Sequence, residues 1–254
     1  MIRSTSPRLL TAVLLLGCML LTGCSTIEVA RAGPGQKHDP WENWNRKVFD
    51  FNEGLDKAVL KPVATAYVDV VPRFVRVGVT NFFNNFADAW SAVNNLLQFK
   101  IELALQDVVR VGTNTVFGLG GFIDVAGEMG IDHHYEDFGQ TLGHWGFGPG
   151  AYVVWPLFGP SSVRETIALP LDRSVSPAVT LNNGSAQAGI TVLQLVNTRA
   201  GLLGATRIVD EIALDKYSFV RDAYLQRRRS LRYDGDAPSK PDPEDDPAIV
   251  PDKK

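Results

Sequence analysis

Cysteine is nearly absent from this 254-residue chain, which contains only Cys18 and Cys24, both close to its N-terminus. If Cys24 becomes the first residue of the mature protein, as argued below, no cysteine follows it. A disulfide framework, a thiol nucleophile and a cysteine-based metal site are then excluded. An excess of one charge is also missing, because 25 Lys and Arg face 28 Asp and Glu. A function in nucleic-acid binding, which needs a basic surface, is therefore not indicated.

The N-terminal apolar run is too short to cross a bilayer. Residues 9–21 are apolar and follow Arg3 and Arg8, whereas a membrane-spanning helix needs about 20 such residues. A positive leader followed by a short apolar run is typical of an export signal. Residues 1–23 are therefore predicted to be a cleavable signal peptide.

The predicted signal peptide is followed by a cysteine, Cys24, whereas the cleavage site of an ordinary secretory signal peptide needs none. Leu21-Thr22-Gly23-Cys24 resembles the lipobox of bacterial lipoproteins, in which the cysteine is acylated and becomes residue one after cleavage. Residues 15–18 partly fit the same pattern, so Cys18 stays as an alternative. Ser25, rather than Asp, follows Cys24 and favours the outer over the inner membrane. The resemblance predicts a lipid anchor on Cys24.

Two segments of the mature chain are poor in large apolar residues. Residues 24–38 form a tether that contains Gly33-Pro34-Gly35, and residues 233–254 are rich in Pro and Asp. Neither can bury enough surface to offset the entropy of ordering, so the acidic tail is predicted to be disordered. Residues 39–232 remain and are long enough for one packed domain.

Alternating strands and internal repeats are missing from this body, and its periodicity predicts an all-α fold. Helices are expected over residues 39–61, with an end at Lys61-Pro62, over 73–100 after the break at Val71-Pro72, and over 101–116. Gly118–Gly121 ends that run, and a glycine-rich stretch lasts to Gly150. Later helices are expected from Ser161-Ser162, with turns near Pro170 and Pro177, and over residues 185–203 and 205–229.

The helix over residues 81–100 has an unusual composition. Phe82, Phe86, Trp90, Val93 and Leu97 share an apolar face, while asparagines and the single charge of Asp88 occupy the other. A water-exposed helix normally covers its outer face with Lys, Glu and Arg. An uncharged polar face suits a helix in a headgroup layer or lining a passage, but an ordinary core helix whose asparagines contact loops fits equally well.

Residues 143–160 are almost uncharged and are interrupted by glycine and proline, so they cannot form one helix. Such a segment is either a buried loop or a loop that dips into a membrane. In lipid, irregular backbone persists only where protein or water satisfies its polar groups.

Catalytic constellations are weak. Residues 132–137 include His133 and His134, but adjacent histidines do not have the spacing of a helical zinc motif. Gly118–Gly121 lacks the third glycine of a dinucleotide fingerprint, and Ser161-Ser162 do not form a nucleophile elbow. The chain is therefore predicted not to be an enzyme and to need no cofactor or metal.

Several motifs across residues 39–230 are similar to those of the MlaA (VacJ) family of outer-membrane lipoproteins. The longest is EDFGQTLGHWGFGPGAYVVWPLFGPSSVRE at residues 136–165. Others are Phe49-Asp50-Phe51-Asn52, GLGGFIDVAGEMGI and Tyr217–Tyr224. Two positions depart from the family pattern, namely Gly112, where an aromatic is common, and Glu165, where Asp is usual.

The resemblance implies a ring-like bundle of amphipathic helices with glycine-rich connecting loops, embedded in one membrane leaflet. Its implied function is removal of mislocalised phospholipids from the outer leaflet, which maintains the lipid asymmetry of the outer membrane. The implied partners are phospholipids, the outer membrane, a trimeric porin and a soluble periplasmic carrier protein. Two other functions stay open: a phospholipid or peptidoglycan hydrolase, and a non-catalytic structural lipoprotein.

Three groups of residues are candidates for this function. The expected membrane-contacting residues are Phe82, Phe86, Trp90, Val93 and Leu97. The expected passage-lining residues are Phe138, Gly139, Gly143, Trp145, Phe147, Gly148 and Gly150. Asn45, Arg46 and Arg110 are expected to face lipid headgroups or to lock helices together.

Overall fold

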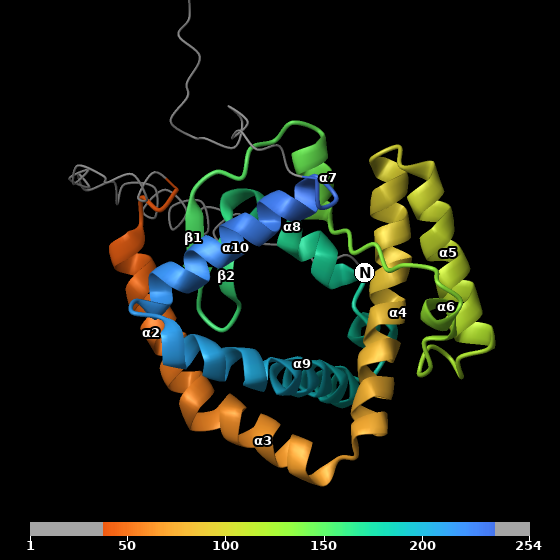
Figure 1. Ribbon diagram of the computed structural model, residues 1–254, viewed down its shortest axis with the longest axis horizontal. Coiled ribbons are helices and arrows are strands. Elements are labelled where there is room, and N and C mark those ends of the chain that lie inside the picture. Colours follow the sequence, from red (N-terminus) through yellow and green to blue (C-terminus); the bar gives the residue numbers. More distant parts are fainter. Residues whose placement is uncertain (1–37, 237–254) are drawn as a thin grey trace, which may run out of the picture. The chain divides into compact units, whose positions relative to one another are not determined.

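The computed structural model describes residues 38–236, and these are mainly helical (Figure 1). The predicted signal peptide, Cys24, most of the tether and all but the first four residues of the predicted tail lie outside them. The helices are α2 (Glu42–Leu55), α3 (Lys61–Val70), α4 (Arg73–Leu97), α5 (Ile101–Val116), α6 (Val125–Glu128), α7 (Phe138–His144), α8 (Val163–Ser174), α9 (Gly184–Ile212) and α10 (Lys216–Arg232). Short π and 3-10 segments span Asp56–Leu60 and Pro177–Thr180.

A small β-hairpin corrects the expectation of helices alone. Strands β1 (Tyr152–Trp155) and β2 (Gly159–Ser162) are antiparallel, with Tyr152 opposite Ser162 and Trp155 opposite Gly159. A loop of three residues joins them, in which Leu157 has a φ of 68°. Two strands of four residues are too short for a clear alternating pattern, so no strand could be predicted from the sequence.

The prediction that the first helix ends at Lys61-Pro62 is wrong. The chain passes from α2 through the π-helical turn Asp56–Leu60 into α3. There the backbone N–H of Lys61 bonds to the carbonyl of Asp56, five residues back. The wider turn accommodates a proline that can neither donate a hydrogen bond nor tolerate a tight preceding turn.

Two further boundaries differ from the predicted ones. Pro170 lies inside α8 rather than in a turn. Helix α9 continues through Gly204 to Ile212, and the break comes at residues 213–215. Asp215 then caps α10 by accepting hydrogen bonds from the backbone of Tyr217 and Ser218, which is a strong signal for a helix start.

The contacts between elements close a ring. Helices α2, α3 and α4 follow one another along the chain, α4 contacts α7, α7 contacts α10, and α10 packs on β2. Strand β1 then packs on α2, which completes the circuit, while α9 lies along α3 and α4 (Figure 1). The apolar core is small and lies where the hairpin meets α2 and α10. It contains Val48, Tyr152, Val154 and Tyr217.

Candidate functional site

Helices α4 and α5 form an antiparallel hairpin with its polar residues inside. On α4 the buried residues include Asn85, Asp88, Ser91, Asn94 and Asn95, and on α5 they include Asp107, Arg110 and Asn114. Both sets recur at spacings of three and four, so each forms one stripe along its helix. The two polar stripes face inward, which is the reverse of a water-soluble helix pair.

An ion pair joins the two stripes. Arg110 Nε lies 3.1 Å from Asp88 Oδ2, and both side chains are almost fully buried. Arg110 also lies 2.9 Å from Asp124 Oδ1 and donates to the carbonyl of Ile131. One guanidinium thus fixes α4, α5 and the two segments around α6, because its fork of donors serves several acceptors at once.

Near the turn of the hairpin, the polar stripe continues into a buried carboxylate. Gln98 Nε2 donates to Glu136 Oε2 over 2.8 Å, and Lys100 Nζ lies 3.3 Å from Glu136 Oε1. Burial raises the pKa of the Glu136 carboxyl to about 7, although both partners oppose the rise. Asn95 Nδ2 similarly donates to Asp107 Oδ2 over 2.8 Å.

The two adjacent histidines serve the same polar interior. His133 Nδ1 contacts Asp88, and His134 Nδ1 lies 3.4 Å from Asp107 Oδ1. The hydrogen bond to Asp88 raises the pKa of His133. Within residues 38–236, no group of three or more His, Cys, Asp and Glu side chains is placed to hold a metal ion.

The outer face of the α4–α5 hairpin is apolar. We define this outer face by the exposed residues Val93, Leu96, Leu97, Phe99, Ile101, Leu105, Val108, Val109, Val116, Phe117 and Leu119. Phe99 stands at the turn, 84% exposed and with a φ of 62°, a conformation that bulky residues seldom adopt. Exposed apolar residues gathered on one pair of helices are typical of a surface that binds a membrane or another protein.

The residues expected to contact a membrane divide into two groups. Val93 and Leu97 lie on the outer face. Phe82 and Phe86 are half-buried and pack together, with Phe82 stacked on Phe122 at a centroid distance of 5.2 Å. Trp90 is also half-buried, and its indole N–H donates to Asp172 over 2.8 Å.

Two residues expected to line a passage, Gly139 and Gly143, are buried. A Cβ on Gly139 would lie 3.0 Å from Arg228 Nη2, and one on Gly143 would lie 2.7 Å from Arg164 Nη1. These glycines make room for two arginines. Arg228 pairs in turn with Asp137 at 2.6 Å and with a carboxylate of α8. Burial opposes ionisation of Asp137, but its bonds to Arg228 hold its pKa below the usual range.

The other expected passage residues are more open. Trp145, Phe147 and Gly148 are exposed, and Phe138 is half-buried with its ring 6.3 Å from that of Trp145. Gly150 has a φ of 68°, which favours glycine.

Asn45 and Arg46 both join α2 to distant segments. Asn45 is fully buried; its Oδ1 accepts from the backbone N–H of Val154 over 2.8 Å, and its Nδ2 donates to Asp39 over 2.8 Å. Arg46 lies 2.6 Å from Asp215, the cap of α10. With Arg110, all three candidate polar residues therefore connect helices to other parts of the ring.

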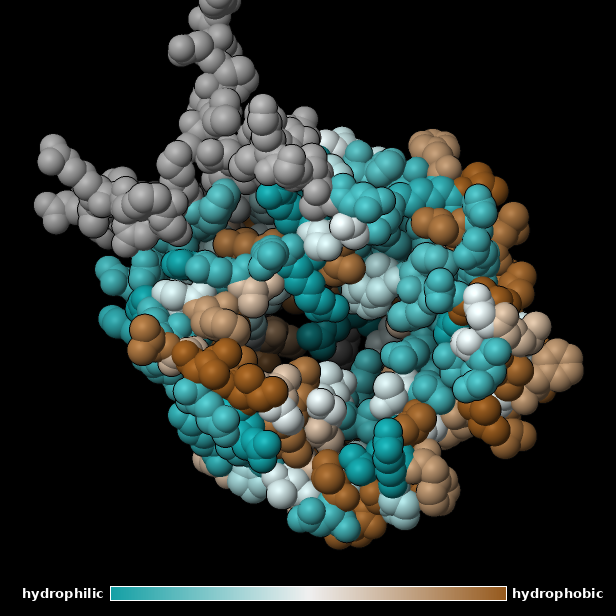
Figure 2. Space-filling view, viewed as in Figure 1, coloured by the Kyte–Doolittle hydropathy of each residue, from teal (hydrophilic) through white to brown (hydrophobic). Residues whose placement is uncertain are grey.

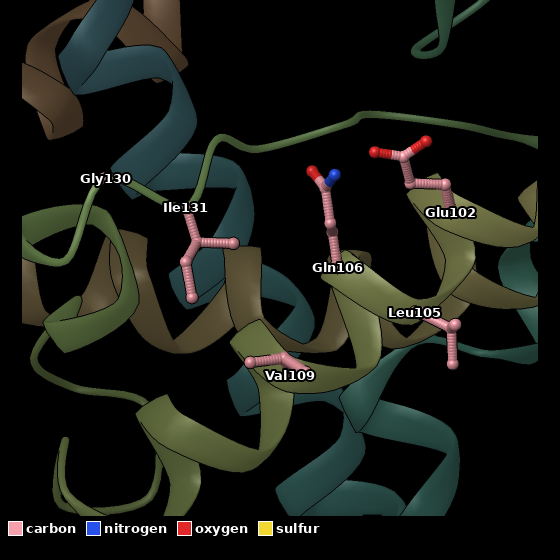
Figure 3. Close-up of a pocket in the computed structure, with 6 residues that line it drawn as sticks. All are labelled: Glu102, Leu105, Gln106, Val109, Gly130 and Ile131. Atoms are coloured by element: carbon pink, nitrogen blue, oxygen red, sulfur yellow. The ribbon is translucent and has the colours of Figure 1, made fainter.

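The described residues form a hollow and, elsewhere, pockets on the α4 and α5 helices. Figure 2 shows that this face is hollowed near its middle, with both polar and apolar residues around the opening. A pocket of about 380 Å³ lies between α5 and Gly130-Ile131, where Glu102 and Gln106 project toward the same side (Figure 3). A second, of about 700 Å³, lies between the start of α4 and Phe122-Ile123.

No helix among residues 38–236 combines the length and apolar composition needed to cross a membrane.

The sequence interpretation missed the inward pairing of the polar stripes. Asp88 was noticed as a lone charge, but its partner Arg110 lies on the next helix, 22 residues away. The available signal was the matching polar spacing of two consecutive helices. Residues 132–137 likewise looked like possible metal ligands, whereas Glu136 and both histidines contact the polar interior of the hairpin.

Comparison with known proteins gives a consistent result. The family model described as MlaA lipoprotein matches residues 37–231. The intermembrane phospholipid transport system lipoprotein MlaA of Escherichia coli is 34% identical over 233 residues, which cover 90% of this chain and 91% of that protein. An uncharacterized protein of Rickettsia bellii is 32% identical over 203 residues, covering 79% of this chain and 80% of that protein.

A solved structure, reported as "Structural basis for maintenance of bacterial outer membrane lipid asymmetry", has the same fold. It superposes with a TM-score of 0.67 at 35% identity and covers 76% of this chain and 98% of that one. The helical fold and the family expected from the sequence motifs are thus confirmed. The chain belongs to the MlaA lipoprotein family.

Proposed function

We propose that this protein is an outer-membrane lipoprotein that removes mislocalised phospholipids from the outer leaflet and passes them to a soluble periplasmic carrier. Its relatives are named for intermembrane phospholipid transport, and the similar structure is described in terms of outer-membrane lipid asymmetry. The proposal includes a lipid anchor on Cys24, a trimeric porin as partner in the membrane, and no catalytic step.

The observation that carries the proposal is the inverted α4–α5 hairpin. In water, the exposed apolar face would be unfavourable. In a lipid leaflet the balance reverses, because acyl chains cover the apolar side chains and the buried polar groups satisfy one another. The hairpin therefore supports a folded domain that is itself embedded in the leaflet, in addition to the acyl chains of the anchor.

The ring supplies the second requirement, a route that is not wholly apolar. A phospholipid has a charged headgroup that crosses a bare bilayer core only at high cost. A hollow bordered by both polar and apolar residues accommodates the two ends of such a molecule (Figure 2). We place Phe138, Trp145, Phe147, Gly148 and Gly150 beside this route, with Gly139 and Gly143 shaping it from behind.

Gene deletion tests the function. In the deletion strain, a membrane-impermeant amine reagent should label more phosphatidylethanolamine on intact cells, and the wild-type gene should restore the low level. An unchanged outer leaflet would overturn the proposal. To test direction, labelled outer-leaflet phospholipid should appear on a soluble periplasmic protein only when the gene is present. Full complementation by a His133→Ala/His134→Ala variant would argue against the hydrolase alternative.

One substitution tests the lipid contact of the outer face. Leu105 is 61% exposed and lies in the second turn of α5, so Leu105→Asp costs little if water surrounds it. At the centre of a hydrocarbon layer the same change costs about 3–4 kcal/mol, and the variant should fail to restore lipid asymmetry. Leu105→Met, which stays apolar, is the matched control. Equal complementation by both variants would show that this face does not contact lipid.

A further inference from the structure

The second pocket differs chemically from the outer face of the hairpin beside it. It has a volume of about 700 Å³ and is lined by Arg73, Phe74, Val77, Gly78, Asn81, Phe122 and Ile123. This volume lies within the range of roughly 300–1,000 Å³ that is typical of small-molecule sites. Its walls are mainly apolar, with one cation at the end where α4 begins.

The apolar walls come from two segments that the hairpin brings together. Gly78 faces Phe122, with a Cβ position 3.4 Å from the Phe122 ring, and Asn81 Nδ2 donates to the Phe122 carbonyl over 3.2 Å. Phe74 is 77% exposed and Ile123 is 50% exposed. The pocket is therefore held in shape by backbone and small-residue contacts, while its large side chains remain uncovered.

Arg73 is the cation of the pocket, and its side chain is exposed. Among the described residues, no carboxylate lies within ion-pair distance of its guanidinium and no hydrogen bond engages its side chain. The lining contains no acidic residue. By contrast, Arg46, Arg110, Arg164, Arg199, Arg221 and Arg228 are all paired with carboxylates.

We propose that this pocket binds one phospholipid of the surrounding leaflet, with an acyl chain along Phe74, Val77 and Phe122 and the phosphodiester at Arg73. The inference rests on the proposed function and names a place where lipid is held on the protein. An unpaired guanidinium beside an apolar groove complements a molecule with an anionic phosphate joined to a hydrocarbon chain.

A photocrosslinking experiment tests the site with the full-length lipidated protein. The protein is reconstituted in liposomes of phosphatidylethanolamine and phosphatidylglycerol that contain a phosphatidylglycerol with a diazirine on its acyl chain. Mass spectrometry should place crosslinks on Phe74, Val77 or Phe122. Arg73→Gln should lower the crosslink yield at these residues about two- to fivefold, as expected for one solvent-exposed charge contact. Val77→Trp, which fills the groove, should lower it as well.

Two controls separate a phosphate-binding site from ordinary boundary lipid. Arg207→Gln removes an exposed arginine of α9, 79% exposed, and should leave the crosslinks unchanged. A glucosyl diacylglycerol with the same diazirine chain but no phosphate should crosslink weakly in the pocket and show no dependence on Arg73. Equal yields for both lipids, or no effect of Arg73→Gln, would overturn the proposal. Loss of crosslinking in the presence of inorganic phosphate alone would identify a free-anion site and would also overturn it.

The failure of this site is distinguishable from failure of the transport function. If the wild-type gene restores lipid asymmetry but no crosslink forms in the pocket, only the site is wrong. If the crosslink forms but the wild-type gene does not change the outer leaflet, the protein binds phospholipid there without the proposed transport.

Discussion

Replacing Arg110 by Met tests whether the polar interior of the hairpin is a sealed network. The guanidinium has three acceptors on three segments, and its side chain is 4% exposed. Asp124 is 38% exposed and stays hydrated without Arg110, whereas Asp88 is 1% exposed and would remain as a buried charge. Stranding one partner of a buried pair costs about 3–5 kcal/mol. Because His133 still contacts Asp88, we expect about 3 kcal/mol for Arg110→Met.

The free energy of unfolding is measured by urea titration of the protein in non-ionic detergent, followed by circular dichroism. Arg207→Met is the matched control and should change it by less than about 0.5 kcal/mol. An Asp88→Asn/Arg110→Met variant, which removes the stranded charge, should recover at least half of the loss. His133 has a raised pKa because of its bond to Asp88, so its protonation as the pH falls through that raised pKa should make the loss in Arg110→Met smaller. A loss under about 1 kcal/mol at neutral pH would refute the buried network.

Two other predictions concern stability. The Glu136 carboxyl has a pKa of about 7 in the folded protein, against an ordinary 4.5. The protonated carboxyl therefore stabilises the fold fully below the unfolded pKa, and this stabilisation is lost as the pH rises through 7. Wild type should therefore lose up to about 3 kcal/mol relative to Glu136→Gln over this window; parallel pH profiles would contradict it. A Cβ on Gly118 would lie 2.1 Å from the Ile123 carbonyl oxygen, while one on Gly112 would meet nothing within 4 Å. Gly118→Ala should thus lower the melting temperature, with a loss of about 2–3 kcal/mol in the free energy of unfolding. Gly112→Ala should raise the melting temperature through a gain of about 0.5–1 kcal/mol. Equal shifts for the two variants would contradict this packing.

The departure at Gly112 shows how a local sequence difference is absorbed. Gly112 lies inside the helix predicted over residues 101–116, at a position where the resemblance implied that an aromatic is common. In the structure Gly112 is exposed on α5, and the helix runs on to Val116. A glycine at such a position lowers helix propensity without leaving a cavity, since no neighbour packs on it.

Helix boundaries could be predicted where the signal is local. Val71-Pro72 separates α3 from α4, Gly118 follows the end of α5, and Ser162 begins α8. These signals depend on backbone chemistry within a few residues, so no tertiary information is needed. Pro62 was misread because the wider π turn that accommodates it has no sequence signature of its own.

The sequence alone predicted a signal peptide that ends at the lipobox-like motif before Cys24. It also identified the family and the helical class, and it showed the two-faced composition of residues 81–100. It could not determine which face of that helix is buried. The polar face could be exposed to water, or the apolar face could be exposed to lipid. The tertiary structure decided this by placing Asp107, Arg110 and Glu136 opposite the polar stripe of α4. Charged partners from distant segments satisfy that stripe inside the protein, and the apolar side chains are left to face outward.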